Sequence, residues 1–378
     1  MPIPVAQARH RILHKDPFAY SAHPHIVALA GGEWLMVFNK SVRRPFILHP
    51  PEDPFFHNVV TRSTDGGASW TTPQVAPAFN CAGAECAGLT PLADGRVLLN
   101  QWRFDWLPLG LARRLEGSRP LRFPAEWAAG WAASPEHEAG DAIAARAEAV
   151  APWARGGGTS YVHVSDDRGA SWTSTTAVDV APYSGGYGMR GAVELPDGDI
   201  LLPLCDVPHY RKVFILRSRD GGRRWDRPVE AAAADGKEFE EPCLLPLAGG
   251  RLLLMLRENA GRRMHRCLSD DGGHSWSPPE PVAIDGYPPH LLRLADGRIL
   301  CTVGRREPPF GIRAVLSRDE GASWDIERTL VIRDDLPNKD LGYPCSIDAG
   351  DGEIFTVYYG QDADGVTAIQ GTRWRLGG

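Results

Sequence analysis

The sequence predicts an all-β protein: a six-bladed β-propeller with a partly helical insertion in its second blade. Three observations favour this fold. An eight-residue motif recurs five times, a strand–turn–strand pattern occurs six times, and successive copies lie about 50 residues apart along most of the chain. We therefore expect one closed domain over residues 1–378, although the length alone would favour two or three domains.

The recurring motif is Ser-x-Asp-x-Gly-x-x-Trp, called the octet here. Its Asp side chain can accept hydrogen bonds from turn amides, its Gly can adopt a positive φ, and its Trp ring can pack between neighbouring sheets. We predict that each octet is the turn between the third and fourth strands of a blade, and hence part of the scaffold. The octets occupy residues 63–70, 165–172, 218–225, 269–276 and 317–324.

In the second pattern, two apolar runs flank a turn that most often contains Asp-Gly or Gly-Gly, which predicts the hairpin of the two inner strands of a blade. No octet follows the last hairpin. Because an open ring would leave an unpaired strand edge, we predict that an N-terminal strand over roughly residues 6–14 completes the last sheet. The six hairpins occupy residues 27–38, 90–100, 194–204, 246–256, 293–303 and 347–359.

Residues 104–157 separate the second hairpin from its octet and form the insertion. This segment is rich in alanine and favours helix. Two roles are open to it: a lid or aromatic platform over a pocket, or a surface through which a homo-oligomer forms. Its aromatic residues include Trp106, Trp127, Trp131 and Trp153.

Composition and charge exclude several classes of protein. Hydrophobic residues make up 43% of the chain and charged residues 23%, which is typical of a globular protein. The net charge of -6 argues against nucleic acid or an anionic membrane as a partner. No apolar run approaches the ~20 residues that span a bilayer. The N-terminus lacks the apolar core of a secretory signal, so we expect a cytoplasmic location, or secretion if a leader has been trimmed.

The cysteine pattern predicts no disulfide framework, metal site or cofactor. Five of the seven cysteines stand singly in apolar runs, where a reduced thiol behaves as a small hydrophobic group. Cys81 and Cys86 have a spacing compatible with a disulfide or a metal ion, but no second close pair accompanies them.

We expect chemistry on the face opposite the octets, where innermost strands begin and second strands end. Polar side chains crowd these positions, which is costly without a ligand, and several arginines suit a carboxylate. Innermost strands would contribute His23, His25, Glu85, Arg190, Glu240, Glu241, Tyr287, His290 and Tyr343. Second strands would contribute Asn39, Lys40, Trp102, Arg103, Asp206, Arg257, Glu258, Arg305, Arg306, Tyr358 and Tyr359.

Outside the insertion, most of the chain resembles the sialidase (neuraminidase) superfamily, whose octets are known as Asp boxes or BNR repeats. In that family a glutamate begins an inner strand and a carboxylate-binding arginine follows about fifteen residues later; Glu241 and Arg257 match this pattern. Tyr343 matches the nucleophilic tyrosine. The resemblance implies a retaining exo-glycoside hydrolase that acts on sialic acid or a related acidic sugar, with Tyr343 and Glu241 as the nucleophile couple.

The resemblance also implies a general acid and further arginines. Asp53 is the candidate acid, with Glu52 and His57 as rivals. Arg306 and Arg313 are both candidates for another carboxylate-binding arginine.

One departure from the family lies in the first inner strand, where sialidases have an Arg-Ile-Pro motif and this chain has no arginine. Arg190 is the candidate to replace that arginine in space. Other expected contacts with the carbohydrate are His23, His25, Tyr287 and His290.

Two other functions remain open. A polysaccharide lyase acting on uronic-acid glycans would use a histidine or tyrosine to abstract a proton, and several histidines lie near the predicted mouth. A propeller can also bind glycans without catalysis. The histidines match no standard metal-site spacing.

Overall fold

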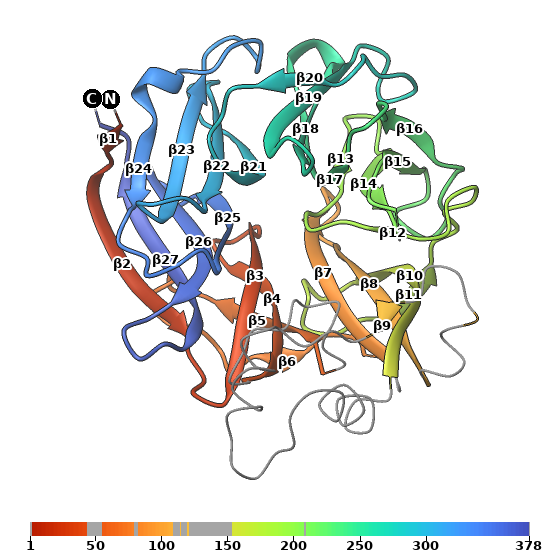
Figure 1. The fold of residues 1–378 in the computed structure, drawn as a ribbon, viewed down its shortest axis with the longest axis horizontal. Coiled ribbons are helices and arrows are strands. Elements are labelled where there is room, and N and C mark those ends of the chain that lie inside the picture. The colour runs from red at the N-terminus through yellow and green to blue at the C-terminus, as the bar shows by residue number, and fades with distance from the viewer. Residues whose placement is uncertain are drawn as a thin grey trace, which may run out of the picture.

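The structure is a computed structural model that describes residues 2–43, 55–78, 82–108, 153–207 and 209–377, with Arg114 and the strand β9 (Arg119–Pro120). Six sheets are arranged around a central axis, as Figure 1 shows. The all-β, six-bladed propeller is therefore confirmed.

The principal strands of each blade pair antiparallel, and the innermost strand lines the axis. From the innermost strand outwards, blade 1 consists of β3 (Ala19–Ala28), β4 (Trp34–Val42), β5 (His57–Ser63) and β6 (Gln74–Val75). Blade 2 consists of β7 (Ala82–Pro91), β8 (Val97–Pro108), β10 (Trp153–Ser165) and β11 (Ser174–Ala177). Blade 3 begins with the short β12 (Gly186–Tyr187) and β13 (Val193–Glu194), followed by β14 (Ile200–Asp206), β15 (Val213–Ser218) and β16 (Val229–Ala232).

Blades 4 to 6 follow the same order. Blade 4 consists of β17 (Phe239–Pro246), β18 (Leu252–Glu258), β19 (Arg263–Ser269) and β20 (Glu280–Val282). Blade 5 consists of β21 (Tyr287–Arg293), β22 (Ile299–Arg305), β23 (Gly311–Ser317) and β24 (Leu330–Arg333). Blade 6 consists of β25 (Leu341–Asp348), β26 (Glu353–Gln361), β27 (Thr367–Arg375) and the N-terminal β2 (Ala6–His14).

The N-terminal strand closes the ring as predicted. β2 pairs antiparallel with β27, so the last sheet contains strands from both ends of the chain. The preceding β1 (Ile3–Pro4) runs parallel to β24 and adds a fifth strand to blade 5. Consequently the two ends of the chain lie next to each other in Figure 1.

The octets form the turns between third and fourth strands, as predicted. In the first octet, Ser63 Oγ donates to Asp65 Oδ1 (2.8 Å), and the amides of Gly67 and Ser69 donate to Ser63 Oγ (2.8 Å) and Asp65 Oδ1 (2.9 Å). The octet tryptophans are half-buried at the edges of the apolar clusters rather than enclosed between sheets. Every described octet is thus a scaffold turn.

Neighbouring blades pack through apolar side chains of their inner strands. Every residue of β14 is buried, and Leu202 and Leu204 of this strand share a cluster with Val162 and Val164 of β10. Burial of such side chains contributes about 1.5–3 kcal/mol each before the entropy cost is counted. Much of the core therefore lies between the blades.

The ends of the insertion are strands, so the prediction of a helix-favouring segment was wrong there. Residues 104–108 extend β8 and residues 153–157 extend β10, and the two strands remain paired from Trp153 and Pro108 onwards. No α-helix occurs in the described residues. Apart from Arg114 and β9, residues 109–152, including Trp127 and Trp131, lie outside the described part, as do Cys81 and the side chain of Cys86.

None of the described residues belongs to a helix with the length and apolarity needed to cross a membrane.

Candidate active site

Bulges in the innermost strands position the side chains of the channel mouth. Five of the six innermost strands break register at the same level, and three bulge residues have positive φ although they are not glycine: His23 (52°), Glu241 (52°) and Tyr343 (49°). Such strain costs on the order of 1–3 kcal/mol per residue and clusters at functional sites. A proline follows each of the three, so the bulge leaves no unpaired N–H at that position.

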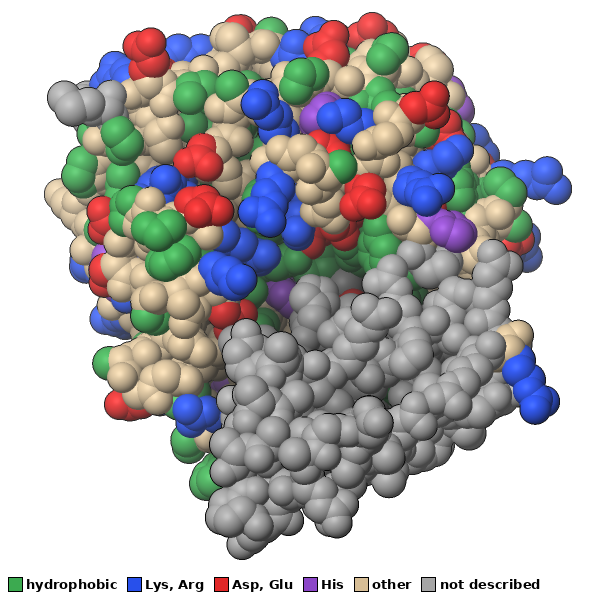
Figure 2. All heavy atoms as spheres, viewed as in Figure 1, with side chains coloured by type: hydrophobic (Ala, Val, Ile, Leu, Met, Phe, Trp, Pro, Cys, Tyr) green, Lys and Arg blue, Asp and Glu red, His purple; other side chains and the backbone are tan. Residues whose placement is uncertain are grey.

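We use the name mouth cluster for the side chains that these strands bring together. The cluster draws on blades 1, 4, 5 and 6, and it lies where the sequence placed it, opposite the octets. Figure 2 shows a hollow near the centre of one face, with basic side chains beside it. The mouth cluster consists of His23, Glu241, Arg257, Tyr287, Arg306, Tyr343 and Tyr359.

Tyr343, Glu241 and Arg257 form one connected unit. The Tyr343 hydroxyl donates a hydrogen bond to Glu241 Oε1, and Arg257 Nη1 donates to Glu241 Oε2 at 3.0 Å. The tyrosine and the glutamate are 3% exposed, so the carboxylate is held between a neutral donor and a cation and is largely screened from solvent.

The electrostatics keep the proton on the tyrosine. Burial alone would raise the pKa of Glu241, but the charge of Arg257, the Tyr343 hydroxyl and the charge of Arg306 outweigh it, so the pKa is lowered. Burial, followed by the charge of Glu241, raises the pKa of Tyr343 well above its ordinary value of 10.0. The unit therefore consists of an ionised carboxylate that accepts a hydrogen bond from a neutral phenol.

Arg306 supplies a second cation at the mouth. Its Nε donates to Leu341 O (3.1 Å), and its guanidinium lies over the rings of Tyr287 (5.4 Å) and Tyr343 (5.6 Å). The Arg257 guanidinium lies 4.3 Å from the centre of the same Tyr287 ring. Cation–π contacts with Tyr287 thus hold both guanidinium groups beside Tyr343.

His23 belongs to β3, the innermost strand of blade 1, which contains no arginine. Its ring lies 4.2 Å from that of Tyr343 and 5.2 Å from that of Tyr359. His23 Nδ1 lies 2.9 Å from Asn39 Oδ1, while Asn39 Nδ2 donates to Asn58. Because the amide of Asn39 donates away from the histidine, its oxygen accepts from His23 Nδ1–H, and in the neutral ring the lone pair is then on Nε2.

A second carboxyl–tyrosine pair adjoins this unit and was not predicted as such. Tyr187 donates a hydrogen bond to Glu240, the residue before Glu241. Burial, with the neighbouring charge of Glu241, raises the pKa of Glu240 to about 7. The adjacent carboxyls Glu240 and Glu241 were a sequence signal of this coupling. No sequence signal pointed to Tyr187 of blade 3 as the partner.

Asp340 and Tyr20 also support the mouth and were not predicted. Tyr20 donates to Asp340 Oδ1 (2.9 Å), Thr367 donates to Asp340 Oδ2 (3.1 Å), and the Tyr20 ring packs against Tyr359. Asp340 precedes Tyr343 by three residues, and this polar residue just before a predicted inner strand was the available signal.

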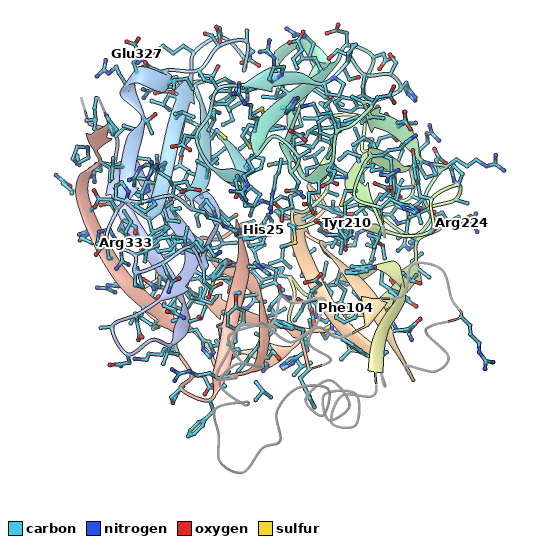
Figure 3. The ribbon with its side chains drawn as sticks, in the orientation of Figure 1. His25, Phe104, Tyr210, Arg224, Glu327 and Arg333 are labelled. Atoms are coloured by element: carbon cyan, nitrogen blue, oxygen red, sulfur yellow. The ribbon has the colours of Figure 1, made fainter. Side chains whose placement is uncertain are left out.

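Other candidate residues lie away from the mouth cluster. Arg190, His25 and His290 line a cavity in the central channel, where Arg190 donates to the carbonyl oxygens of Pro289 and Pro344. Figure 3 shows His25 close to the axis of the ring. Arg313 is buried in β23 and donates to Arg333 O, so of the two alternatives the structure brings only Arg306 to the cluster.

The candidate acid belongs to a segment outside the described part of the chain. Asp53 and its rival Glu52 lie outside the described residues, whereas His57 begins β5 and its Nδ1 lies 2.9 Å from the carbonyl oxygen of Phe55.

Comparisons with known proteins agree with this architecture. The family description "BNR repeat-like domain" matches residues 145–356. No curated protein sequence matches the chain. All the similar solved structures described next are less than 25% identical and therefore support the fold alone.

A protein of unknown function from Dyadobacter fermentans is 22% identical over 98% of this chain and 99% of its own, with a TM-score of 0.80. The NanB sialidase from Streptococcus pneumoniae is 13% identical over 99% of this chain and 71% of its own, with a TM-score of 0.70. The alpha-L-arabinanase from Penicillium chrysogenum, complexed with arabinobiose, is 12% identical over 99% of both chains, with a TM-score of 0.64. The fold is thus that of a sialidase-like, glycoside hydrolase-like propeller.

Proposed function

The chain belongs to the BNR repeat-like domain family, and from this premise we propose that it is a retaining exo-glycoside hydrolase acting on an acidic sugar. The observation that carries the proposal is the hydrogen bond from Tyr343 to Glu241, with Arg257 on the other carboxylate oxygen. A phenol is a poor nucleophile, and an adjacent ionised base is what activates it.

In the first step, Tyr343 Oη attacks the anomeric carbon as its proton passes to Glu241, and the glycosidic C–O bond breaks. The leaving oxygen takes a proton from a general acid, for which Asp53 is our candidate. In the second step, the carboxylate of the general acid removes a proton from water, and the water oxygen displaces Tyr343 from the anomeric carbon. Glu241 then returns its proton to Tyr343. Two inversions retain the configuration.

The two guanidinium groups support an acidic substrate. Arg257 uses one nitrogen on Glu241 and Arg306 uses Nε on a backbone carbonyl, and no other acceptor for either group is found among the described residues. Free donors beside the tyrosine suit a carboxylate close to the anomeric carbon. Sialic acid or a related acidic sugar is the substrate class that we propose.

A mass-spectrometric trapping experiment tests this function. The chain is incubated with fluorinated acidic glycosyl fluorides, which slow hydrolysis of the intermediate, and then digested. A glycosyl adduct on Tyr343 is expected in the wild type and is expected to be absent in Tyr343→Phe. An adduct on a carboxylate, or turnover without an adduct and without dependence on Tyr343, would contradict the mechanism.

A uronate lyase is the second candidate, and the position of His23 favours it. The Nε2 lone pair of His23 lies on a ring that packs against Tyr343, so a base and a phenol meet beside two arginines. A lyase releases an unsaturated, ultraviolet-absorbing product, whereas the hydrolase releases only a reducing sugar. Loss of that product in His23→Gln would support the lyase, and binding without either product would indicate a glycan-binding propeller.

A further inference from the structure

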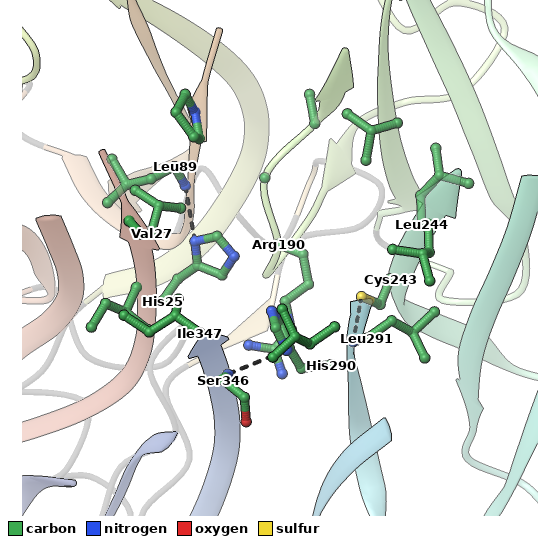
Figure 4. A pocket seen from close by; sticks show the side chains of 18 of the residues that line it. His25, Val27, Leu89, Arg190, Cys243, Leu244, His290, Leu291, Ser346 and Ile347 are labelled. Atoms are coloured by element: carbon green, nitrogen blue, oxygen red, sulfur yellow. Dashed lines mark hydrogen bonds between the residues drawn. The ribbon is translucent and has the colours of Figure 1, made fainter. Parts of the chain in front are cut away.

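A cavity of about 400 Å³ lies in the central channel, and all six blades line it (Figure 4). Four innermost strands carry a histidine or cysteine at this level, two positions after the bulge, and three of these residues, His25, Cys243 and His290, line the cavity. Each of the four side chains accepts a backbone N–H from the neighbouring innermost strand. The four contacts run from Leu89 N to His25 Nδ1 (3.1 Å), Leu291 N to Cys243 Sγ (3.3 Å), Ser346 N to His290 Nδ1 (3.3 Å) and Ile26 N to Cys345 Sγ (3.4 Å).

This repeated contact fixes the protonation of both imidazoles. Because Nδ1 of His25 and Nδ1 of His290 each accept a backbone N–H, the proton of each neutral ring is on Nε2. Burial, with the charge of Arg190, lowers the pKa of His25 to about 3 and that of His290 well below its ordinary value, so both rings are neutral. Each Nε2–H is thus a donor, and neither has an acceptor among the described residues.

Arg190 brings a positive charge into the same space. It is 3% exposed, and its Nε and Nη2 donate to Pro289 O (3.1 Å) and Pro344 O (2.9 Å). Its Nη1 is buried and has no partner in the described part of the chain, where Arg190 also forms no ion pair. The carboxylate that lines this cavity, Asp348, is exposed and accepts from Gly350 N. A buried guanidinium without a counter-charge is costly.

A metal ion does not fit these donors, although one nitrogen of His25, one of His290 and Cys345 Sγ lie within 4.8 Å of one another. A metal needs a lone pair on each histidine, and here the inward nitrogens carry protons. Burial raises the pKa of the Cys345 thiol to about 12, so it is not a thiolate. The adjacent charge of Arg190 would also repel a cation.

We propose that the channel holds a small inorganic anion of the halide class, bound by Arg190 Nη1 and the Nε2–H groups of His25 and His290. A single charge matches the one guanidinium. A halide also suits walls that are otherwise apolar, such as Ile26 and Leu291, because it needs few donors. The anion would neutralise Arg190, which in turn holds the carbonyl of Pro344, the residue after Tyr343.

Bromide is the probe for this site, and the full chain is used. Crystals grown in sodium bromide are expected to show an anomalous peak between Arg190 and the two histidines. In solution, replacing chloride by gluconate at equal ionic strength is expected to lower the Tm by about 2 °C or more. The Arg190→Met variant should lose this chloride dependence.

Arg313→Met is the matched control, because Arg313 is a similarly buried arginine bonded to backbone carbonyls outside the channel. It should keep the chloride dependence. An empty channel in bromide crystals, or a divalent metal at His25, His290 and Cys345 by elemental analysis, would overturn the proposal. Bromide density without a Tm response in the wild type would indicate an adventitious ion only, and would overturn it as well. If Arg190→Met does not fold, the wild-type crystals and melting curves decide.

Discussion

Tyr343 donates its phenolic hydrogen bond to Glu241 across the mouth of the channel, although 102 positions separate the two residues in the chain. The pair exists only because blades 4 and 6 face the same axis. Both residues have a left-handed backbone, which shows that the surrounding sheets hold them in place against a local conformational cost.

Removing the phenol should abolish turnover and leave the fold intact. In Tyr343→Phe we expect kcat on an acidic aryl glycoside to fall by about 10³-fold or more, because the nucleophile is lost. Glu241 keeps Arg257, so the far-ultraviolet circular dichroism spectrum should be unchanged. A variant with wild-type kcat would refute the role of Tyr343.

The candidate acid predicts a dependence on the leaving group. In Asp53→Asn, glycosides with poor leaving groups should react about 10²–10⁴-fold more slowly, whereas activated aryl glycosides should be nearly unaffected in the first step. Measuring kcat/KM over a series of leaving-group pKa values checks this. Equal losses for every leaving group would instead favour Glu52 or His57 as the acid.

The two alternative arginines should behave differently. Arg306→Met should lower kcat/KM for the acidic substrate by about 10- to 100-fold, since a charge-assisted contact is worth roughly 1.5–3 kcal/mol. Arg313→Met, which lies away from the mouth, should leave kcat/KM unchanged per folded molecule. Equal effects of the two substitutions would show that Arg306 does not contact the substrate.

Glu240 should make stability depend on pH. Its carboxyl titrates near 4.5 when unfolded and at about 7 when folded, so the folded state retains a proton between these values. The free energy of unfolding should therefore decrease as the pH rises from about 4.5 to 7, by at most about 3 kcal/mol from this group. Urea unfolding of the wild type and Glu240→Gln at several pH values isolates this contribution, because the amide cannot titrate. Parallel curves for the two proteins would refute it.

Close packing of blades 2 and 3 makes Gly88 a sensitive position. A Cβ at Gly88 would lie 2.2 Å from the carbonyl carbon of Arg190, which is backbone and cannot rotate away. Gly88→Ala should destabilise the protein by about 1–3 kcal/mol or more, measured by chemical denaturation. Gly377→Ala is the control, because no atom lies within 4 Å of the added group. Identical midpoints for the two variants would contradict the packing argument.

Local patterns explain why so much of the fold could be predicted. The octets and the inner hairpins are short-range signals, and ring closure by residues 6–14 followed from the cost of an unpaired edge. The meeting of Tyr343, Glu241 and Arg257 needed only the strand order and one resemblance. To predict the hydrogen-bond partners of Glu240 and Asp340 would have required distances between blades, which one sequence does not contain.

Bulges account for the largest differences from the prediction. Alternation along an ideal strand does not tell which residue a bulge turns towards the mouth, and so His23 could not be separated from His25. Arg190 lies where the innermost strand of blade 3 is interrupted between β12 and β13, and its side chain lines the channel cavity. One sequence does not reveal this interruption. The insertion, in turn, favours helix by composition, but pairing between β8 and β10 overrides this preference at both of its ends.

Closure by β2 also sets an order of events during synthesis. His10 and Thr372 are hydrogen-bonded neighbours, yet 362 positions separate them, so β2 leaves the ribosome long before its partner exists. The last sheet is also the one that carries Tyr343. A nascent chain therefore displays Glu241 and Arg257 with no phenol opposite them, and the complete mouth first arises when translation of this segment has finished and the two ends have met.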